Sequence, residues 1–128
     1  TKELQDAFSS HLKETQQQLE RVHGLLEEFG ENPGSTKCDA MEGLIEEGSH
    51  MIKEEATAAV KDAGLIAAAQ RVEHYEMAGY GTARAYAEAL GETNAVAVLG
   101  SILEEESHAN EKLNKIAIGT VNPAAKAG

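Results

Sequence analysis

The sequence predicts an all-α protein, an antiparallel bundle of long helices with one shorter helix in a crossover. Alanine, leucine and glutamate dominate the composition, aromatic residues make up only 4% of it, and the chain of 128 residues has two prolines. Such a composition favours helices over sheets. Three long segments repeat their apolar residues with a helical period, and no segment of useful length alternates apolar and polar residues as a strand would.

The first long helix is predicted over residues 3–29, because apolar residues recur there every three or four positions. These residues are Leu4, Phe8, Leu12, Leu19, Val22, Leu26 and Phe29. Gly30 ends the helix, and Pro33 and Gly34 mark the loop that follows. A helix predicted over residues 38–55 is shorter than the others, so we place it in the crossover connection.

Two further long helices complete the predicted fold. One begins near residue 62, is stopped by Gly91, and has a stripe made of Leu65, Ala69, Val72, Glu76, Gly79, Ala83, Tyr86 and Leu90. The other runs from Thr93 to about Ile118. We therefore expect residues 1–118 to form one helical domain and the small, Pro-containing tail 119–128 to be flexible.

The charge and cysteine content limit the partners and the location of the protein. Eleven basic residues against 22 acidic ones give a net charge of −11, which excludes nucleic acid and anionic membranes as favoured partners and attracts cations. No signal peptide or membrane-spanning apolar run is visible. Cys38 is the only cysteine, so we expect a cytoplasmic protein in which Cys38 is a small buried residue.

Polar side chains interrupt the apolar stripe of each long helix near its middle. In the helix over residues 62–90, Glu76 lies at the centre of the stripe and Glu73 lies one turn before it. The other interruptions are His11, Glu14 and Gln18 in the first helix and Glu106 and Asn110 in the last. Because the three sets have similar heights in the bundle, we expect them to meet in its core.

Several carboxylates buried at one level require a positive partner. One unpaired buried carboxylate costs several kcal/mol, roughly, and no lysine or arginine lies on these stripes to compensate it. A metal ion is the remaining cation, and carboxylates with a nearby imidazole suit iron or manganese. Taken singly, each acid could also be partly solvated, and Gln18 and Asn110 could set the helix register by hydrogen bonding.

The sequence "EESH" contains a literal Glu-x-x-His motif, Glu105 to His108. His108 lies about 160° around the helix from Glu106, so it is expected to face solvent. We keep Glu105 and His108 as secondary metal candidates, together with Gln18 and Asn110.

Three stretches carry a family likeness. The segments "CDAMEGLIEEG", "AQRVEHYEMAGYGTARAYAEALG" and "LEEESHANEKL" resemble the bacterial YciE/YciF-like stress proteins of the ferritin-like superfamily. The resemblance implies a ferritin-like four-helix bundle with a crossover segment, a tendency to dimerise, and a di-metal centre. It implicates Glu73, Glu76 and Glu106 as ligands, with Glu105 adjacent.

The chain departs from this family in two ways. Family members usually have histidine where this chain has Gln18 and aspartate where it has Asn110, and both changes remove good ligands. The first helix of the family bundle is also expected to be missing. The missing helix would leave an apolar groove. Either another chain covers it in a homodimer or larger homo-oligomer, or helices are swapped between protomers, or the natural protein is longer.

Two functions follow from these observations. The first is a stress-response protein with a di-iron or di-manganese site that oxidises ferrous iron or consumes peroxide. Its ligands are expected to be Glu73, Glu76 and Glu106, with His11 or Glu14. The second is a metal-free helical dimerisation module, in which the inward acids hydrogen-bond to other polar side chains.

Overall fold

The protein is described here by a computed structural model that covers residues 1–127. Its helices are α1 (Lys2–Glu28), α2 (Asp39–Lys53), α3 (Ala58–Leu90), α4 (Thr93–Ile116) and α5 (Asn122–Ala127). One π-helical turn, Ala117–Val121, joins α4 to α5. Residues 1–127 contain no strand, and the predicted all-α fold is confirmed.

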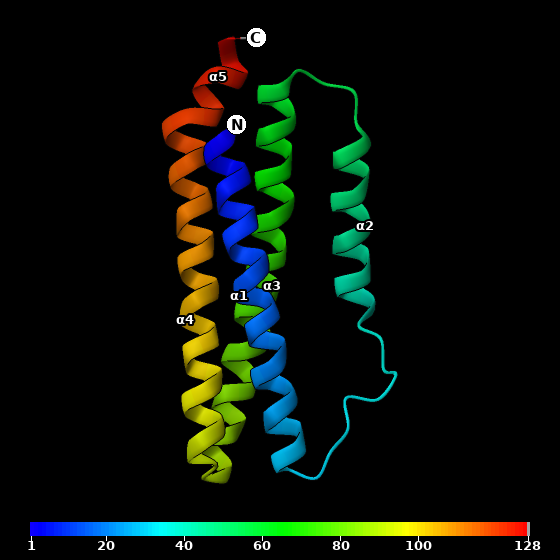
Figure 1. The fold of residues 1–128 in the computed structure, drawn as a ribbon, viewed down its shortest axis with the longest axis vertical. Helices are drawn as coiled ribbons and strands as arrows, with labels where there is room; N and C mark the ends of the chain where they lie inside the picture. Colours follow the sequence, from blue (N-terminus) through cyan, green and yellow to red (C-terminus); the bar gives the residue numbers. More distant parts are fainter. Residues whose placement is uncertain (128) are drawn as a thin grey trace.

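The three long helices lie side by side, and α2 stands apart from α1 and α4 (Figure 1). Helix α4 packs against both α1 and α3, whereas α2 packs against α3. A long loop after α1 leads to α2, so α1 and α3 run in the same direction and α4 runs against both. This is the crossover topology predicted for a ferritin-like bundle.

Two apolar clusters fill the ends of the bundle. One contains Leu4, Ala7, Ile66, Leu113, Ile116, Ala117 and Val121, and the other contains Leu25, Ala87 and Ala95. Each large apolar side chain buried here stabilises the fold by about 1.5–3 kcal/mol. Between the two clusters lie the buried polar residues Gln18, Glu73 and Glu106, together with the apolar Ile102 and Ala68. The fold therefore holds its polar residues at mid-height, as the sequence predicts.

The predicted helix boundaries hold for α1, α2 and α4 but not for the start of α3. Helix α3 begins at Ala58, earlier than predicted, and its Gly64 lets α2 approach closely, because a Cβ there would lie 2.3 Å from Met51 Sδ. Helix α4 ends at Ile116, close to the predicted end near Ile118, but the residues after it are helical rather than a frayed tail. The backbone continues through the π turn into α5, and Val121 is fully buried.

Part of the predicted apolar stripes of α1 and α3 faces solvent. Tyr86 and Leu90 of α3 are 67% and 76% exposed, and Leu12 and Leu19 of α1 are also exposed. On α3 the most deeply buried acid is Glu73, not Glu76, so the buried face is centred differently from the prediction. The reason is that one side of the bundle has no covering helix within residues 1–127.

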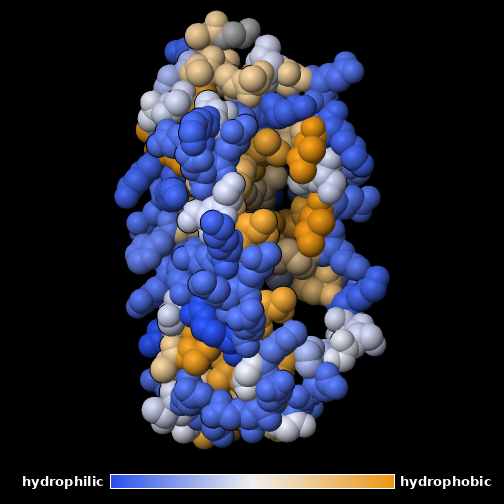
Figure 2. Space-filling view, viewed as in Figure 1, coloured by the Kyte–Doolittle hydropathy of each residue, from blue (hydrophilic) through white to orange (hydrophobic). Residues whose placement is uncertain are grey.

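That open side forms an apolar groove between α1, α2 and α3. Its walls include Phe8 of α1, Leu44, Ile45 and Ile52 of α2, and Leu65 and Val72 of α3. In Figure 2, apolar side chains gather around the hollow between α2 and the rest of the molecule. We call this feature the α1–α2–α3 groove. Within residues 1–127 no helix is long and apolar enough to cross a membrane.

Candidate metal centre

Three long helices each contribute one side chain to a compact polar cluster. His11 comes from α1, Glu73 from α3 and Glu106 from α4, and one ligand atom of each lies within 4.8 Å of the other two. His11 Nε2 is 3.0 Å from Glu73 Oε1 and 3.7 Å from Glu106 Oε2. We refer to these residues as the triad. It joins positions far apart in the sequence that were all predicted as metal candidates.

The triad carboxylates are buried and incompletely satisfied. The side chain of Glu73 is 3% exposed and that of Glu106 is 0% exposed. Glu73 Oε2 and both oxygens of Glu106 have no hydrogen-bond partner within the described residues. Since buried polar atoms are normally paired, these three oxygens mark a place where a cation would be stabilising.

Burial and interactions within the triad raise the pKa values of two of its members, His11 and Glu106. The hydrogen bond between His11 and Glu73 raises the pKa of His11 to about 9, although burial opposes this shift. Burial is the largest cause that raises the pKa of Glu106 to about 8; a hydrogen bond that the protonated acid shares with Glu73 and the negative charges of Glu76 and Glu73 add to it, and His11 opposes it. At pH 7 without metal, His11 is therefore an imidazolium and Glu106 a neutral acid. Both must lose a proton before they can ligate a metal.

Two further predicted ligands lie beside the triad. Glu76 is partly buried, and its pKa is raised by burial and by Glu73, while His11 opposes the shift. Glu14 is more exposed, and its Oε2 lies 3.4 Å from His11 Nδ1. His11 thus has Glu14 on one side and the two triad carboxylates on the other.

Three of the secondary candidates, Gln18, Glu105 and Asn110, form hydrogen bonds with other side chains, whereas His108 does not within residues 1–127. Gln18 is buried and donates its amide N–H to Glu105 Oε2 at 3.1 Å. Asn110 Oδ1 accepts a hydrogen bond from Gln70 at 3.1 Å. His108 is exposed on α4, as its helical phase predicts. None of these residues, nor Glu105, belongs to the triad.

Arg21 is the functional neighbour that the sequence reasoning did not identify. Its guanidinium forms an ion pair with Glu105, and the two side chains are partly buried. Burial alone would raise the pKa of Glu105, but the hydrogen bonds from Arg21 and Gln18 outweigh it and lower this pKa. A signal was present, because Arg21 follows Gln18 by three positions and so lies on a neighbouring face of α1.

The expectation that Cys38 is buried is wrong. It is exposed at the start of α2, where it begins the helix as the N-cap residue. Its Sγ lies 2.9 Å from Tyr75 Oη. This hydrogen bond lowers the pKa of Cys38. Cys38 lies apart from the triad and takes no part in it.

The donor set of the triad fits a transition metal. Two carboxylates and an imidazole on three different helices form the mixed oxygen and nitrogen environment that iron and manganese accept in helical bundles. Glu76 and Glu14 are the nearest additional carboxylates. The unpartnered oxygens of Glu73 and Glu106 are the observation in the structure that favours a bound cation over a purely hydrogen-bonded core.

Comparison with known proteins gives consistent matches. The family described as a domain of unknown function, DUF892, matches residues 1–126. Protein YciF of Escherichia coli (strain K12) is 47% identical over 124 residues, which are 96% of this chain and 75% of that protein.

Two solved structures also match this chain. The crystal structure of the E. coli stress protein YciF, 47% identical, superposes with a TM-score of 0.86 over 91% of this chain and 74% of its own. The structure of YcfI from Rhodopseudomonas palustris, 44% identical, gives the same TM-score and the same coverage of both chains.

Proposed function

This chain belongs to the DUF892 family, and we propose that it is a ferritin-like metal protein of the bacterial stress response. The family likeness predicted from the sequence is confirmed by its similarity to the E. coli stress protein YciF. The metal, its chemistry and the assembly of the protein are our proposal.

The observation that carries the proposal is the triad. Its ligand atoms lie within 4.8 Å of one another, and three of its buried carboxylate oxygens lack a partner. When Glu106 is ionised these buried oxygens are unpaired, and a buried unsatisfied polar group costs about 1–3 kcal/mol. A bound cation would supply the missing partner for all three oxygens.

We assign His11, Glu73 and Glu106 as the principal ligands, with Glu76 and Glu14 completing a di-iron or di-manganese site. Such a metal pair supplies oxidation of ferrous iron coupled to reduction of oxygen or peroxide. The residues themselves hold and release protons. His11 and Glu106 keep the metal-free cluster close to neutral, and the loss of their protons makes the ligand set anionic when a cation binds.

The reactivity is tested by following ferrous iron oxidation after addition of oxygen or peroxide. We expect the protein to accelerate the oxidation well above the rate in buffer, and Glu106→Gln to abolish this acceleration. Glu105→Gln is the matched control, because it makes the same chemical change one residue away, on a side chain held by Arg21. Equal rates for the protein and for buffer would contradict the proposed reactivity.

We also propose that a second copy of the chain covers the α1–α2–α3 groove. The groove has apolar walls, and Ile45 and Ile52 on its edge are exposed. Apolar patches of this kind mark interaction sites. This surface also supports the second candidate function, a metal-free dimerisation module, which predicts that Glu106→Gln leaves every property except core stability unchanged.

A further inference from the structure

His11 is the member of the triad that reaches solvent. Its side chain is 23% exposed, whereas the side chains of Glu73 and Glu106 are 3% and 0% exposed. The two imidazole nitrogens face different surroundings. Nε2 lies 3.0 Å from the buried Glu73, and Nδ1 lies 3.4 Å from the more exposed Glu14. The imidazole ring therefore lies between the buried carboxylates and solvent.

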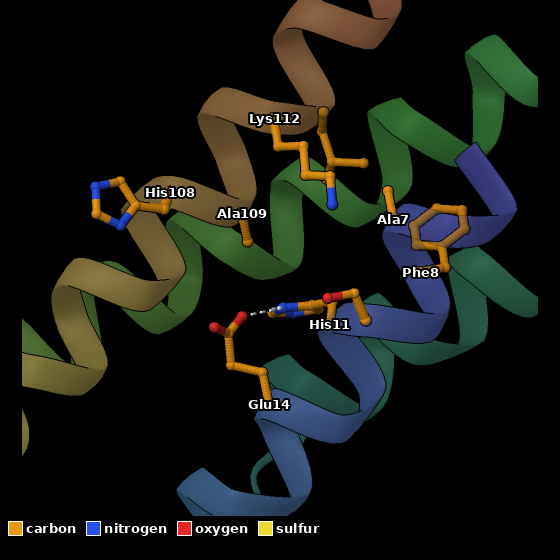
Figure 3. A pocket seen from close by; sticks show the side chains of 9 residues that line it. Ala7, Phe8, His11, Glu14, His108, Ala109 and Lys112 are labelled. Atoms are coloured by element: carbon orange, nitrogen blue, oxygen red, sulfur yellow. Dashed lines mark hydrogen bonds and ion pairs between the residues drawn. The ribbon is translucent and has the colours of Figure 1, made fainter. Parts of the chain in front are cut away.

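The outer side of His11 lines a cleft between α1 and α4 with a volume of about 160 Å³. Ala7, His11 and Glu14 contribute to its α1 side, and His108, Ala109 and Lys112 contribute from α4. Figure 3 shows Ala109 facing His11 across the cleft and the Lys112 ammonium directed into the space between the helices. The volume admits several water molecules and hence a partly hydrated ion. We call this feature the α1–α4 cleft.

We propose that the α1–α4 cleft is the path by which a divalent cation enters and leaves the triad, an inference that rests on the proposed metal-binding function. Glu14 is the carboxylate that the ion meets in the cleft, and His11 separates it from Glu73 and Glu106. The path is short, because a single side chain lies between the outer carboxylate and the buried ones.

Lys112 opposes the entering ion. Its ammonium faces the cleft, and it forms no ion pair with any residue in the described range 1–127. A lone positive charge near the path repels a divalent cation. Its removal is expected to raise the uptake rate about three- to five-fold at low ionic strength, with a smaller effect in salt.

The test is stopped-flow uptake of Co²⁺ alone, followed by tyrosine fluorescence. The chain has three tyrosines and no tryptophan, and Tyr80 lies one helical turn from Glu76, so quenching reports an ion in the core. Ala109→Leu narrows the cleft, and Ala97→Leu adds the same side chain at an exposed position of α4. Lys112→Gln removes the opposing charge, and Lys13→Gln removes an exposed one about 200° around α1 from His11.

We expect Ala109→Leu to slow Co²⁺ uptake at least five-fold and Lys112→Gln to accelerate it. The final quenching should be the same in both variants. The controls Ala97→Leu and Lys13→Gln should leave the uptake rate unchanged. Unchanged rates in both cleft variants, with normal final quenching, would overturn the path and leave the metal site standing. Absence of quenching in the unmodified protein would overturn the metal-binding proposal itself. Helical circular dichroism shows whether Ala109→Leu is folded, and Lys112→Gln, a surface change, tests the path independently.

Discussion

Glu105 and Glu106 are neighbours in the sequence with opposite surroundings. Glu106 points into the bundle, where burial raises its pKa to about 8. Glu105 points toward α1, where hydrogen bonds from Arg21 and Gln18 overcome the effect of burial and lower its pKa. One step of about 100° around the helix thus separates a candidate ligand from a structural ion pair.

The metal-free protein should lose stability as the pH rises. Glu106 has a pKa of about 8 when folded and 4.5 as its ordinary value, and His11 has about 9 against 6.5. The folded state therefore binds more protons than the unfolded state between these limits, and the free energy of unfolding falls with increasing pH. Urea titrations from pH 6 to 9 with chelator should show the steepest fall between about 6.5 and 8. A rise over this range would contradict the assigned shifts.

Substitution of the two adjacent glutamates by glutamine should change the stability of the protein in opposite directions. At pH 9 the metal-free Glu106→Gln variant should be more stable than the unmodified protein by about 1 kcal/mol or more, because a buried charge is removed. Glu105→Gln should be less stable by about 1 kcal/mol, because it weakens the bonds to Arg21 and Gln18. Urea unfolding of both variants with chelator measures this, and equal effects would show that the two sites are not distinct.

At the scale of the helices, the sequence predicts the elements better than the faces they bury. The spacing of apolar residues predicted the bounds of α1 and α2 closely. Gly91 ends α3 in a left-handed conformation, with φ 75°, as expected for a glycine that stops a helix. Periodicity alone could not show that Leu12 and Tyr86 are exposed. Their exposure depends on which helices are neighbours, and that is a property of the whole fold.

The sequence placed Glu76 at the centre of the α3 stripe and Glu73 one turn before it, whereas Glu73 is the deeper of the two acids in the structure. The apolar stripe predicted for α3 included residues that line the α1–α2–α3 groove. The centre of the predicted stripe therefore lies on a different face of α3 from the centre of the buried surface. His11, Glu73 and Glu106 were all among the predicted ligands, because each interrupts an apolar surface at a similar height.

The helical segment after α4 was missed because of a local change in helix period. Gly119 and Pro123 are typical of a frayed tail, yet the π turn at Ala117–Val121 changes the helix phase and brings Val121 into the core. Pro123 then falls in the first turn of α5, directly after the π turn.

Val121 should therefore contribute to stability although it lies beyond the predicted domain boundary. Val121→Ala should lower the free energy of unfolding by about 1–2 kcal/mol, since the side chain is fully buried. The control is Ile118→Ala in the same π turn, where the side chain is exposed and the loss should be below about 0.5 kcal/mol. Urea denaturation compares the two, and equal losses would mean that this segment does not pack as described.

For the molecule as a whole, the open groove and the acidic charge are the main features. The net charge of −11 raises the local concentration of cations around the protein. The α1–α2–α3 groove leaves apolar side chains uncovered between α2 and the rest of the molecule (Figure 2). The chain spans about three quarters of the length of its E. coli relative, 75%. The oligomeric state of the protein therefore depends on what covers the α1–α2–α3 groove.

The proposed dimer predicts that charges on the groove edge dissociate it. Ile45→Glu with Ile52→Glu should convert a dimer to a monomer, because both side chains are exposed on the groove wall and ionised groups are costly at an apolar interface. Ile118→Glu, an equally exposed isoleucine away from the groove, should leave the dimer intact. Light scattering coupled to size-exclusion chromatography reads the mass. A monomeric unmodified protein at high concentration would contradict the proposal.

The most direct test of the proposed metal function is the iron content of the protein after loading with ferrous iron under argon and removal of free metal. Our account predicts at least stoichiometric iron per chain in the unmodified protein, retained in Glu105→Gln and lost in Glu106→Gln. An unmodified protein that stays free of iron, or a Glu106→Gln variant that binds as much as the unmodified protein, would contradict the assignment of the triad as the metal centre.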